Sequence, residues 1–308
     1  MALIVARASG AQAPQSLTVR ADNDAFNFWH TPGKRPDEEY TSGVFVRYDG
    51  GAVPWWARGM SRQLDACATR SAACRTRSLE LGQDLFTPRR TWDSVTAPPG
   101  SRPNAAWLYL GESARILRLR RADEFTVTIG VTGPPALGEF TQRIAHDVIP
   151  ASHRPMDWSN QIAFEPGIVL GYQQTRRVAL GTAFDLLPRF RAEAGNIATN
   201  AEAGIRLRSG WHLQHPWLPV SSDRVEVAFS AGASARAVAR DLFLDGSTFS
   251  SGPRVGHEPL VYGADWGLTI RYRSLGVNAG AVTESRTYST GPAMHTWSTL
   301  SVTLVRTR

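Results

Sequence analysis

The sequence predicts an all-β fold: a closed antiparallel transmembrane β-barrel of about twelve strands, with one short loop helix around residues 137–149. Three observations support this prediction. Apolar and polar residues alternate along most of the chain, which is the pattern of strands with one apolar face. Several alternating runs extend for ten to fifteen residues, whereas strands of soluble proteins centre on about five or six. No apolar stretch reaches the roughly eighteen residues of a transmembrane helix.

The alternation is clearest in EFTVTIGVTG, residues 124–133, where Phe125, Val127 and Ile129 share one face. Turn sequences such as TGPPALG and STGPAM separate many of the runs. The candidate strands are 17–27, 41–49, 77–86, 105–119, 123–133, 161–173, 176–191, 197–208, 224–239, 259–273, 275–288 and 295–306. An even number of long strands, joined by alternating short and long connections, is typical of outer-membrane barrels.

Aromatic residues near predicted strand ends fit the aromatic girdles of such a barrel: Trp55, Trp56, Trp107, Tyr109, Trp211, Trp217, Trp266 and Trp297. A large soluble β-sandwich or barrel is the alternative that the strand pattern leaves open. No repeat of fixed period is visible, which argues against a propeller.

The formal net charge is +7, and Lys34 is the only lysine among 34 basic residues. Arginine suits phosphate and carboxylate groups, so this balance is compatible with nucleic acid, with anionic lipid headgroups, or with no special partner. The interleaved aromatic and basic residues of a single-strand nucleic-acid binder are missing. We therefore expect no nucleic-acid partner.

Residues 1–13, MALIVARASGAQA, resemble the end of a secretory signal with an A-x-A site at Ala11–Ala13. We expect export, with residues 14–308 forming a single barrel domain. Cys67 and Cys74 lie in a polar stretch. One disulfide in an oxidising compartment and two free thiols both remain open for this pair.

Residues 137–149 interrupt the alternation. Their apolar residues are three or four apart, as in an amphipathic helix: Leu137, Phe140, Ile144 and Val148. Gln142 and His146 are also four apart and share a face. A loop helix must pack on the barrel, so we expect this polar pair close to the wall. By periodicity alone, His146 is as compatible with a solvated surface position.

Two polar clusters lie at the ends of the first two predicted strands. The first contains Asp22, Asn23 and Asp24. The second contains Glu38, Glu39, Thr41 and Ser42. Their oxygens suit a hard cation such as Ca²⁺, although turns that are stabilised by Asx side chains use the same residues.

A loop rich in proline and arginine follows. It contains Arg89, Arg90 and Arg102, and arginine can clamp phosphate oxygens in bidentate fashion. They fit equally well as solvated loop charges.

Six blocks in this order resemble the outer-membrane lipid A 3'-O-deacylases of LpxR type: NDAF, YTSG, GQDLFTP, SRPNAAWLY, GVTGPPALGEFTQRIAHD and DWSNQIAFEP. The resemblance covers about the first 170 residues, and beyond them only the strand pattern continues. It implies a twelve-stranded barrel in the outer membrane of a Gram-negative bacterium. It also implies a site between the barrel wall and the loop helix, where calcium-dependent hydrolysis removes an ester-linked acyl chain, at the 3'-O-position, from lipid A of lipopolysaccharide.

Carried over by motif, the resemblance implies catalytic roles for Asn23, Thr41, Gln142 and His146, and a Ca²⁺ ligand at Asp24. His146 would take a proton from the attacking water. Arg89, Arg90 and Arg102 are the candidate substrate-binding residues. The expected partners are lipopolysaccharide and the surrounding outer-membrane lipids, and a monomer is the default state.

The sequence departs from the family in three places. Arg89 and Arg90 stand near a position where some members have a Lys-Arg pair, Asn104 stands where tyrosine is common, and the chain ends LVRTR without a terminal aromatic residue. A non-catalytic barrel and an outer-membrane phospholipid hydrolase with a serine nucleophile are the alternative functions. The sequence contains no evident serine partner for His146.

Overall fold

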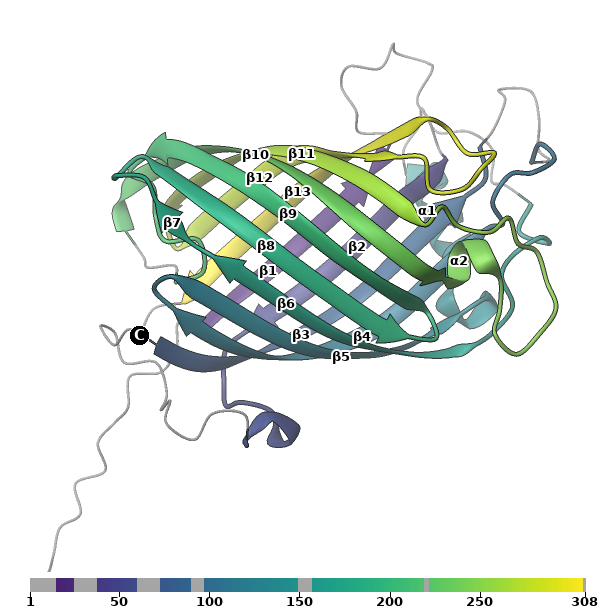
Figure 1. The fold of residues 1–308 in the computed structure, drawn as a ribbon, viewed down its shortest axis with the longest axis horizontal. Coiled ribbons are helices and arrows are strands. Elements are labelled where there is room, and N and C mark those ends of the chain that lie inside the picture. Colours follow the sequence, from purple (N-terminus) through teal and green to yellow (C-terminus); the bar gives the residue numbers. More distant parts are fainter. Residues whose placement is uncertain are drawn as a thin grey trace, which may run out of the picture.

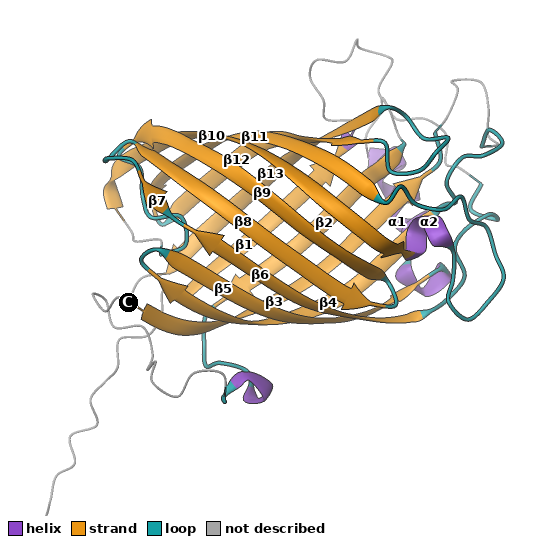
Figure 2. Ribbon diagram, viewed as in Figure 1, coloured by secondary structure: helices purple, strands orange, loops and turns teal. Residues whose placement is uncertain are grey.

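The strands of the protein form one closed barrel, shown in Figures 1 and 2. The computed structural model describes residues 15–24, 38–59, 73–89, 97–148, 157–218 and 222–306. Within these residues the sheet order is β6-β5-β4-β3-β2-β1-β13-β12-β11-β10-β9-β8-β7, and pairing of β6 with β8 closes the sheet. The strand β7 has two residues, so the barrel wall consists of the twelve long strands.

The strands of the wall are β1 (Gln15–Asn23), β2 (Glu39–Asp49), β3 (Ala73–Thr87), β4 (Ala105–Arg118), β5 (Arg121–Thr132), β6 (Pro166–Arg176), β8 (Phe184–Gly195), β9 (Ala198–Trp211), β10 (Ser222–Asp241), β11 (Leu260–Arg273), β12 (Leu275–Ser285) and β13 (Met294–Arg306). The short elements are β7 (Val178–Ala179), the 3₁₀ helices η2 (Trp55–Ala57) and η3 (Pro134–Ala136), and the α-helices α1 (Gly138–Val148) and α2 (Leu242–Asp245). Among the described residues, no helix is both long and apolar enough to cross a membrane.

All twelve predicted strands and the predicted helix are confirmed, with two notable shifts of a boundary. The strand predicted at 161–173 begins five residues later, at Pro166. The run predicted at 176–191 becomes the short β7, a turn and then β8. Leu180 N–H donates to Phe184 O at 2.9 Å, and Gly181 has a φ of +87°. Glycine permits this left-handed turn, and the turn moves the start of the strand to Phe184.

The outer face of the barrel is apolar and the lumen is polar. Val19, Val44 and Leu81 are 46%, 44% and 55% exposed on the outer face. Inside, Arg47 Nη2 lies 2.8 Å from Glu124 Oε1, and Arg115 Nη1 lies 2.6 Å from Asp49 Oδ1. A soluble barrel has the reverse arrangement, so this pattern rules out the soluble alternative and identifies a membrane-embedded wall.

Four of the expected girdle aromatics lie elsewhere. Tyr109, whose Oη donates to Glu80, and Trp297, which lines the cavity beneath α2, face the lumen, and the girdle prediction is wrong for both. Two more are buried: Trp107 and Trp217 are 5% and 8% exposed. Trp107 packs with Tyr109, and Trp217 Nε1 donates to Arg118 O at 2.7 Å, on a segment that lines the lumen. Their position at a strand end or in a connection did not distinguish a lumen side chain from a girdle side chain. The girdle prediction is wrong for these two residues.

Most of the long connections lie at one end of the barrel. Helices α1 and α2 lie at the same end (Figure 2), in the long connections after β5 and β10. At the opposite end, only Leu119 and Arg120 separate β4 from β5, and Ser274 alone separates β11 from β12. Outer-membrane barrels place their long loops outside the cell. The end with the two helices is therefore the outer end.

Candidate functional site

A row of paired residues crosses four neighbouring strands near the outer end. Asn23 of β1 lies opposite Ser42 of β2, Ser42 opposite Leu85 of β3, and Leu85 opposite Ala106 of β4. Directly opposed residues of antiparallel strands lie on the same face. Val44, two residues from Ser42 on the same face, is exposed. The whole row therefore lies on the membrane-facing wall, outside the lumen.

Helix α1 is seated on this row. Gly138 begins the helix, and a Cβ atom there would lie 2.6 Å from Ala106 Cβ and 2.5 Å from the ring of Trp158. These distances are too short for a Cβ atom, so only glycine fits at position 138. Just before the helix, Gln83 Nε2 donates to Ala136 O at 2.6 Å. The start of α1 is therefore fixed against the outer faces of β3 and β4.

The polar side of α1 faces the wall and its apolar side faces away. Gln142 is 3% exposed, and its Oε1 accepts a hydrogen bond from Trp158 Nε1 at 2.7 Å. Phe140 and Ile144 are 54% and 47% exposed. This arrangement is the inverse of a helix on a soluble protein, and it suits a helix in contact with lipid. His146, one turn beyond Gln142, is half-buried.

The ends of β1 and β2 bring further predicted residues together. Asp24 is fully buried, and its Oδ2 accepts a hydrogen bond from Glu38 N–H at 2.8 Å. Thr41 is buried in an irregularity of the β2–β3 register, with its Oγ1 2.5 Å from Thr87 Oγ1. One contact joins Asp24 to Glu38 and the other joins Thr41 to Thr87, both at the ends of the strands beside Asn23.

The predicted arginines lie in different environments. Arg89 is 62% exposed, and its Nε lies 3.5 Å from Glu38 Oε2, which places it beside the strand ends just described. Arg90 is outside the described residues. Arg102 is 5% exposed, stacks over the Phe86 ring at 4.4 Å and pairs with Glu39 at 3.5 Å. Its guanidinium is committed inside the barrel, where a buried charge requires a partner. A clamp on an external phosphate does not fit that position.

The donor atoms at this site are oxygens. Asp24 supplies a buried carboxylate, with Thr41 close to the same strand ends. Across the part of the chain that the structure describes, no group of three His, Cys, Asp or Glu side chains could hold a metal ion. Ca²⁺ accepts carbonyl, hydroxyl and water oxygens beside a carboxylate. Asp24 and Thr41 thus supply oxygen atoms of the kind that Ca²⁺ accepts.

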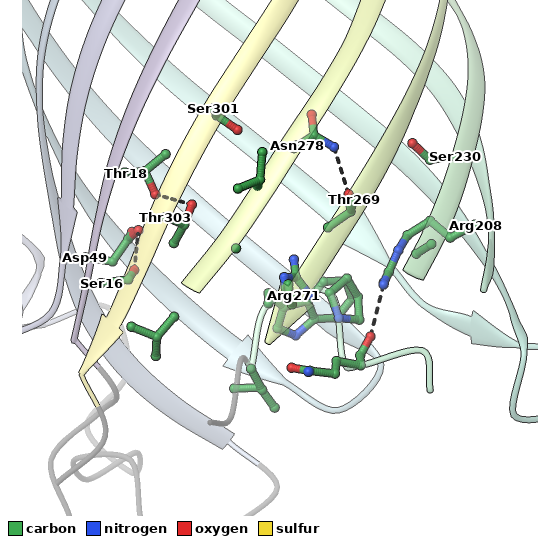
Figure 3. A pocket seen from close by; sticks show the side chains of 18 of the residues that line it. Ser16, Thr18, Asp49, Arg208, Ser230, Thr269, Arg271, Asn278, Ser301 and Thr303 are labelled. Atoms are coloured by element: carbon green, nitrogen blue, oxygen red, sulfur yellow. Dashed lines mark hydrogen bonds between the residues drawn. The ribbon is translucent and has the colours of Figure 1, made fainter. Parts of the chain in front are cut away.

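Two cavities lie inside the barrel, away from α1. The larger, of about 460 Å³, opens near the end with short connections, where hydroxyls such as Thr18 and Thr303 line it beside Arg208 and Arg271 (Figure 3). Both arginines pair with Glu226, at 3.2 and 3.0 Å. The second, of about 350 Å³, lies beneath α2. Neither of these two cavities is lined by the predicted catalytic residues.

Sequence reasoning missed two residues that shape the site, Gly138 and Trp158. It also grouped Glu39 with the oxygens that suit a cation, whereas the Glu39 carboxylate pairs with Arg102 inside the barrel. Gly138 and Trp158 both belong to blocks that carried the family resemblance, although no spacing indicated their contact. Cys67 and the side chain of Cys74 are outside the described residues, so the disulfide stays a prediction. The predicted signal segment, residues 1–13, is also outside the described residues and stays a prediction.

A twelve-stranded barrel with an apolar outer face, long outer loops and a helix against its wall defines an outer-membrane β-barrel protein. Residues 1–305 match the family described as "Outer membrane protein LpxR". The chain belongs to this family and is a protein of the outer membrane of a Gram-negative bacterium.

Among solved structures, LpxR from Salmonella typhimurium is similar, with a TM-score of 0.74 and 19% identity, covering 94% of this chain and 99% of that one. The β domain of the Bordetella autotransporter Brka covers 96% of this chain and 99% of its own, with a TM-score of 0.44 and 9% identity. Among curated proteins, none matches.

Proposed function

We propose that this protein is a calcium-dependent hydrolase that removes an ester-linked acyl chain, at the 3'-O-position, from lipid A of lipopolysaccharide. One observation carries the proposal. Helix α1 packs on the membrane-facing wall with Gly138 and Gln142 buried and with Phe140 exposed. The polar side of the helix thus meets the wall at the lipid-facing surface of the barrel, which is where an acylated substrate resides.

Distances along the wall support a shared site. Ala106 and Asn23 are three strand spacings apart, about 14 Å at roughly 4.8 Å per strand. From Gly138 to His146, helix α1 advances about 12 Å at 1.5 Å per residue. A helix seated at Ala106 therefore has the length to bring His146 towards the strands that carry Asn23, Asp24 and Thr41.

Each side chain has a role that matches its chemistry. Neutral His146 would accept a proton from water as that water attacks the ester carbonyl. Gln142, whose oxygen is held by Trp158, would direct its NH₂ group to a substrate oxygen. Asn23 and Thr41 would orient water and substrate. Calcium, when bound through Asp24, supplies positive charge near the developing oxyanion.

The proposal is tested in cells by mass spectrometry of lipid A, with and without this gene and with and without a chelator. We expect one acyl chain to be lost from lipid A only when the gene and divalent cation are present. Phospholipid composition, measured in the same extracts, should not change. Loss of phospholipid acyl chains would support the phospholipase alternative, and unchanged lipid A would support a non-catalytic barrel.

The variant His146→Ala separates catalysis from folding. We expect it to abolish acyl release, because no other group would take the proton from water. The barrel should still show heat-modifiable migration in SDS gels. Full activity of this variant would contradict the assigned role.

A further inference from the structure

Glu39 has a backbone conformation that is unusual for its residue type. Its φ is 63°, in the left-handed region, and it stands at the first position of β2. Residues with a side chain rarely adopt this region unless the surroundings impose it. Glu39 lies in the segment between Asp24 and Thr41, and its left-handed backbone conformation there requires a physical cause.

The cause lies inside the barrel. Glu39 is 3% exposed, and its Oε1 accepts a hydrogen bond from Tyr288 Oη at 2.7 Å. Its Oε2 lies 3.5 Å from Arg102 Nη1. Tyr288 is 1% exposed, and burial together with the Glu39 carboxylate raises the pKa of Tyr288, so its hydroxyl remains a donor. The Glu39 carboxylate is thus held by Arg102 and Tyr288, which come from two connections far apart in the sequence.

The left-handed turn breaks the alternation of β2. Glu39 and Tyr40 are consecutive, yet both line the lumen cavity beneath α2, and Tyr40 Oη donates to Asp84 Oδ1 at 2.9 Å. The β2–β3 register then shifts between Tyr40 and Ser42. At this shift, the Thr41 hydroxyl contacts the Thr87 hydroxyl.

The same turn also orients the preceding residue. Glu38 N–H points to Asp24 Oδ2 at 2.8 Å. The Glu39 backbone therefore stands between two contacts of the proposed site, the Glu38 amide on one side and Thr41 on the other. A change of its φ would displace both at once.

We infer that Glu39 is a positioning residue for the site on the outer wall. Its carboxylate, held in the lumen by Tyr288 and Arg102, maintains the left-handed turn that places Glu38 N–H on Asp24 and Thr41 beside Thr87. This inference rests on the proposed function. According to this inference, contacts inside the lumen position residues of the site on the outer wall.

Three substitutions at one position test the inference. Glu39→Ala removes the carboxylate and keeps the steric penalty of the left-handed region, so we expect kcat to fall about 10-fold or more with little change in KM. Glu39→Gly removes the same carboxylate but tolerates the turn, and should retain clearly more activity than the alanine variant. Glu39→Gln keeps an acceptor for Tyr288 and should stay closest to the wild type.

A role through charge alone gives a different order. If Glu39 served only to neutralise Arg102, the alanine, glycine and glutamine variants would lose activity equally. That result would overturn the inference. Tyr288→Phe, which leaves residue 39 unchanged, provides a second test and should lower kcat less than Glu39→Ala does.

Hydrogen exchange of the peptide that covers residues 38–42 gives a readout that does not depend on activity. We expect faster exchange at the Glu38 amide in Glu39→Ala than in Glu39→Gly. Equal exchange in wild type and alanine variant would overturn the inference. Wild-type protein that fails to release an acyl chain would instead refute the proposed function, and the exchange difference would still decide whether Glu39 positions this segment.

Discussion

At the residue scale, the structure distinguishes side chains that sequence reasoning grouped together. Arg89 and Arg102 were predicted for the same role, yet Arg89 is exposed beside Glu38 and Arg102 is buried with Glu39. Spacing did not separate them, because twelve residues lie between them, and spacing over that length does not show on which side of the wall each side chain lies. Trp158 was part of a family block, but its hydrogen bond to Gln142 depends on packing between two separate segments.

The Trp158–Gln142 contact leads to a prediction about amide orientation. Trp158→Phe keeps an aromatic ring and removes the N–H that binds Gln142 Oε1. A buried acceptor without its donor costs about 1–3 kcal/mol, and the amide loses the contact that fixes its oxygen. If the whole cost falls on the transition state, kcat for acyl release should fall by about the corresponding 5- to 160-fold, with KM nearly unchanged.

The matched variant is Gln142→Glu, which keeps an acceptor for Trp158 and removes the NH₂ group. If that group acts on a substrate oxygen, this variant should lose activity although its contact with Trp158 persists. Wild-type kinetics in both variants would mean that Gln142 only fills space.

The two arginines provide a second prediction, about stability. Arg102→Ala leaves Glu39 buried without its cation, and removing one partner of a buried pair costs about 3–5 kcal/mol. Arg89 is largely exposed, so Arg89→Ala should change the free energy of unfolding by less than about 0.5 kcal/mol and should instead raise KM for lipid A. Urea unfolding of the barrel in lipid vesicles, together with kinetics, measures both effects. Equal stability of the two variants would contradict the lumen location of Arg102.

At the scale of elements, periodicity predicted most of the architecture. Runs such as residues 124–133 alternate because one face meets lipid and the other meets the lumen, so β5 was found within two or three residues of its bounds. The helix was also found, since its apolar residues repeat every three or four positions. The contact between Gly138 and Trp158 determines which side of α1 meets the wall. Periodicity alone does not predict that contact. The supposition that the polar pair faces the wall is confirmed for Gln142.

The seat of α1 predicts a difference between two glycine substitutions. Gly138→Ala places a methyl group 2.5–2.6 Å from the ring of Trp158 and from Ala106. The helix must move away from the wall, so we expect acyl release to fall about 10-fold or more, as a misplacement near 1 Å does in other enzymes. Gly252→Ala, in the α2 loop, meets nothing within 4 Å and serves as the control. Both barrels should remain folded, because the strands are untouched.

At the scale of the whole molecule, the fold and the site have separate physical origins. The wall is held by backbone pairing around the full circle of strands, which membrane burial reinforces. The site depends on a few contacts outside that circle, at Asp24, Thr41 and Gln142. The fold could therefore be predicted, because the alternating pattern is repeated over hundreds of residues. The site could not, because it depends on single contacts between distant segments, such as that between Glu39 and Tyr288.

This separation leads to a prediction about calcium. Because Asp24 lies at the end of β1 and not within the strand pairing, removing calcium should abolish acyl release and leave the barrel closed. A structural metal behaves differently, since its loss unfolds the domain that it holds. Chelated protein should therefore keep its heat-modifiable migration in SDS gels while lipid A retains all its acyl chains, and added Ca²⁺ should restore activity. In Asp24→Asn, added Ca²⁺ should restore little, because the carboxylate that would bind the ion is gone. If the barrel unfolded on chelation, the ion would have a structural role in the barrel. If the protein kept full activity in chelator, acyl release would not depend on calcium.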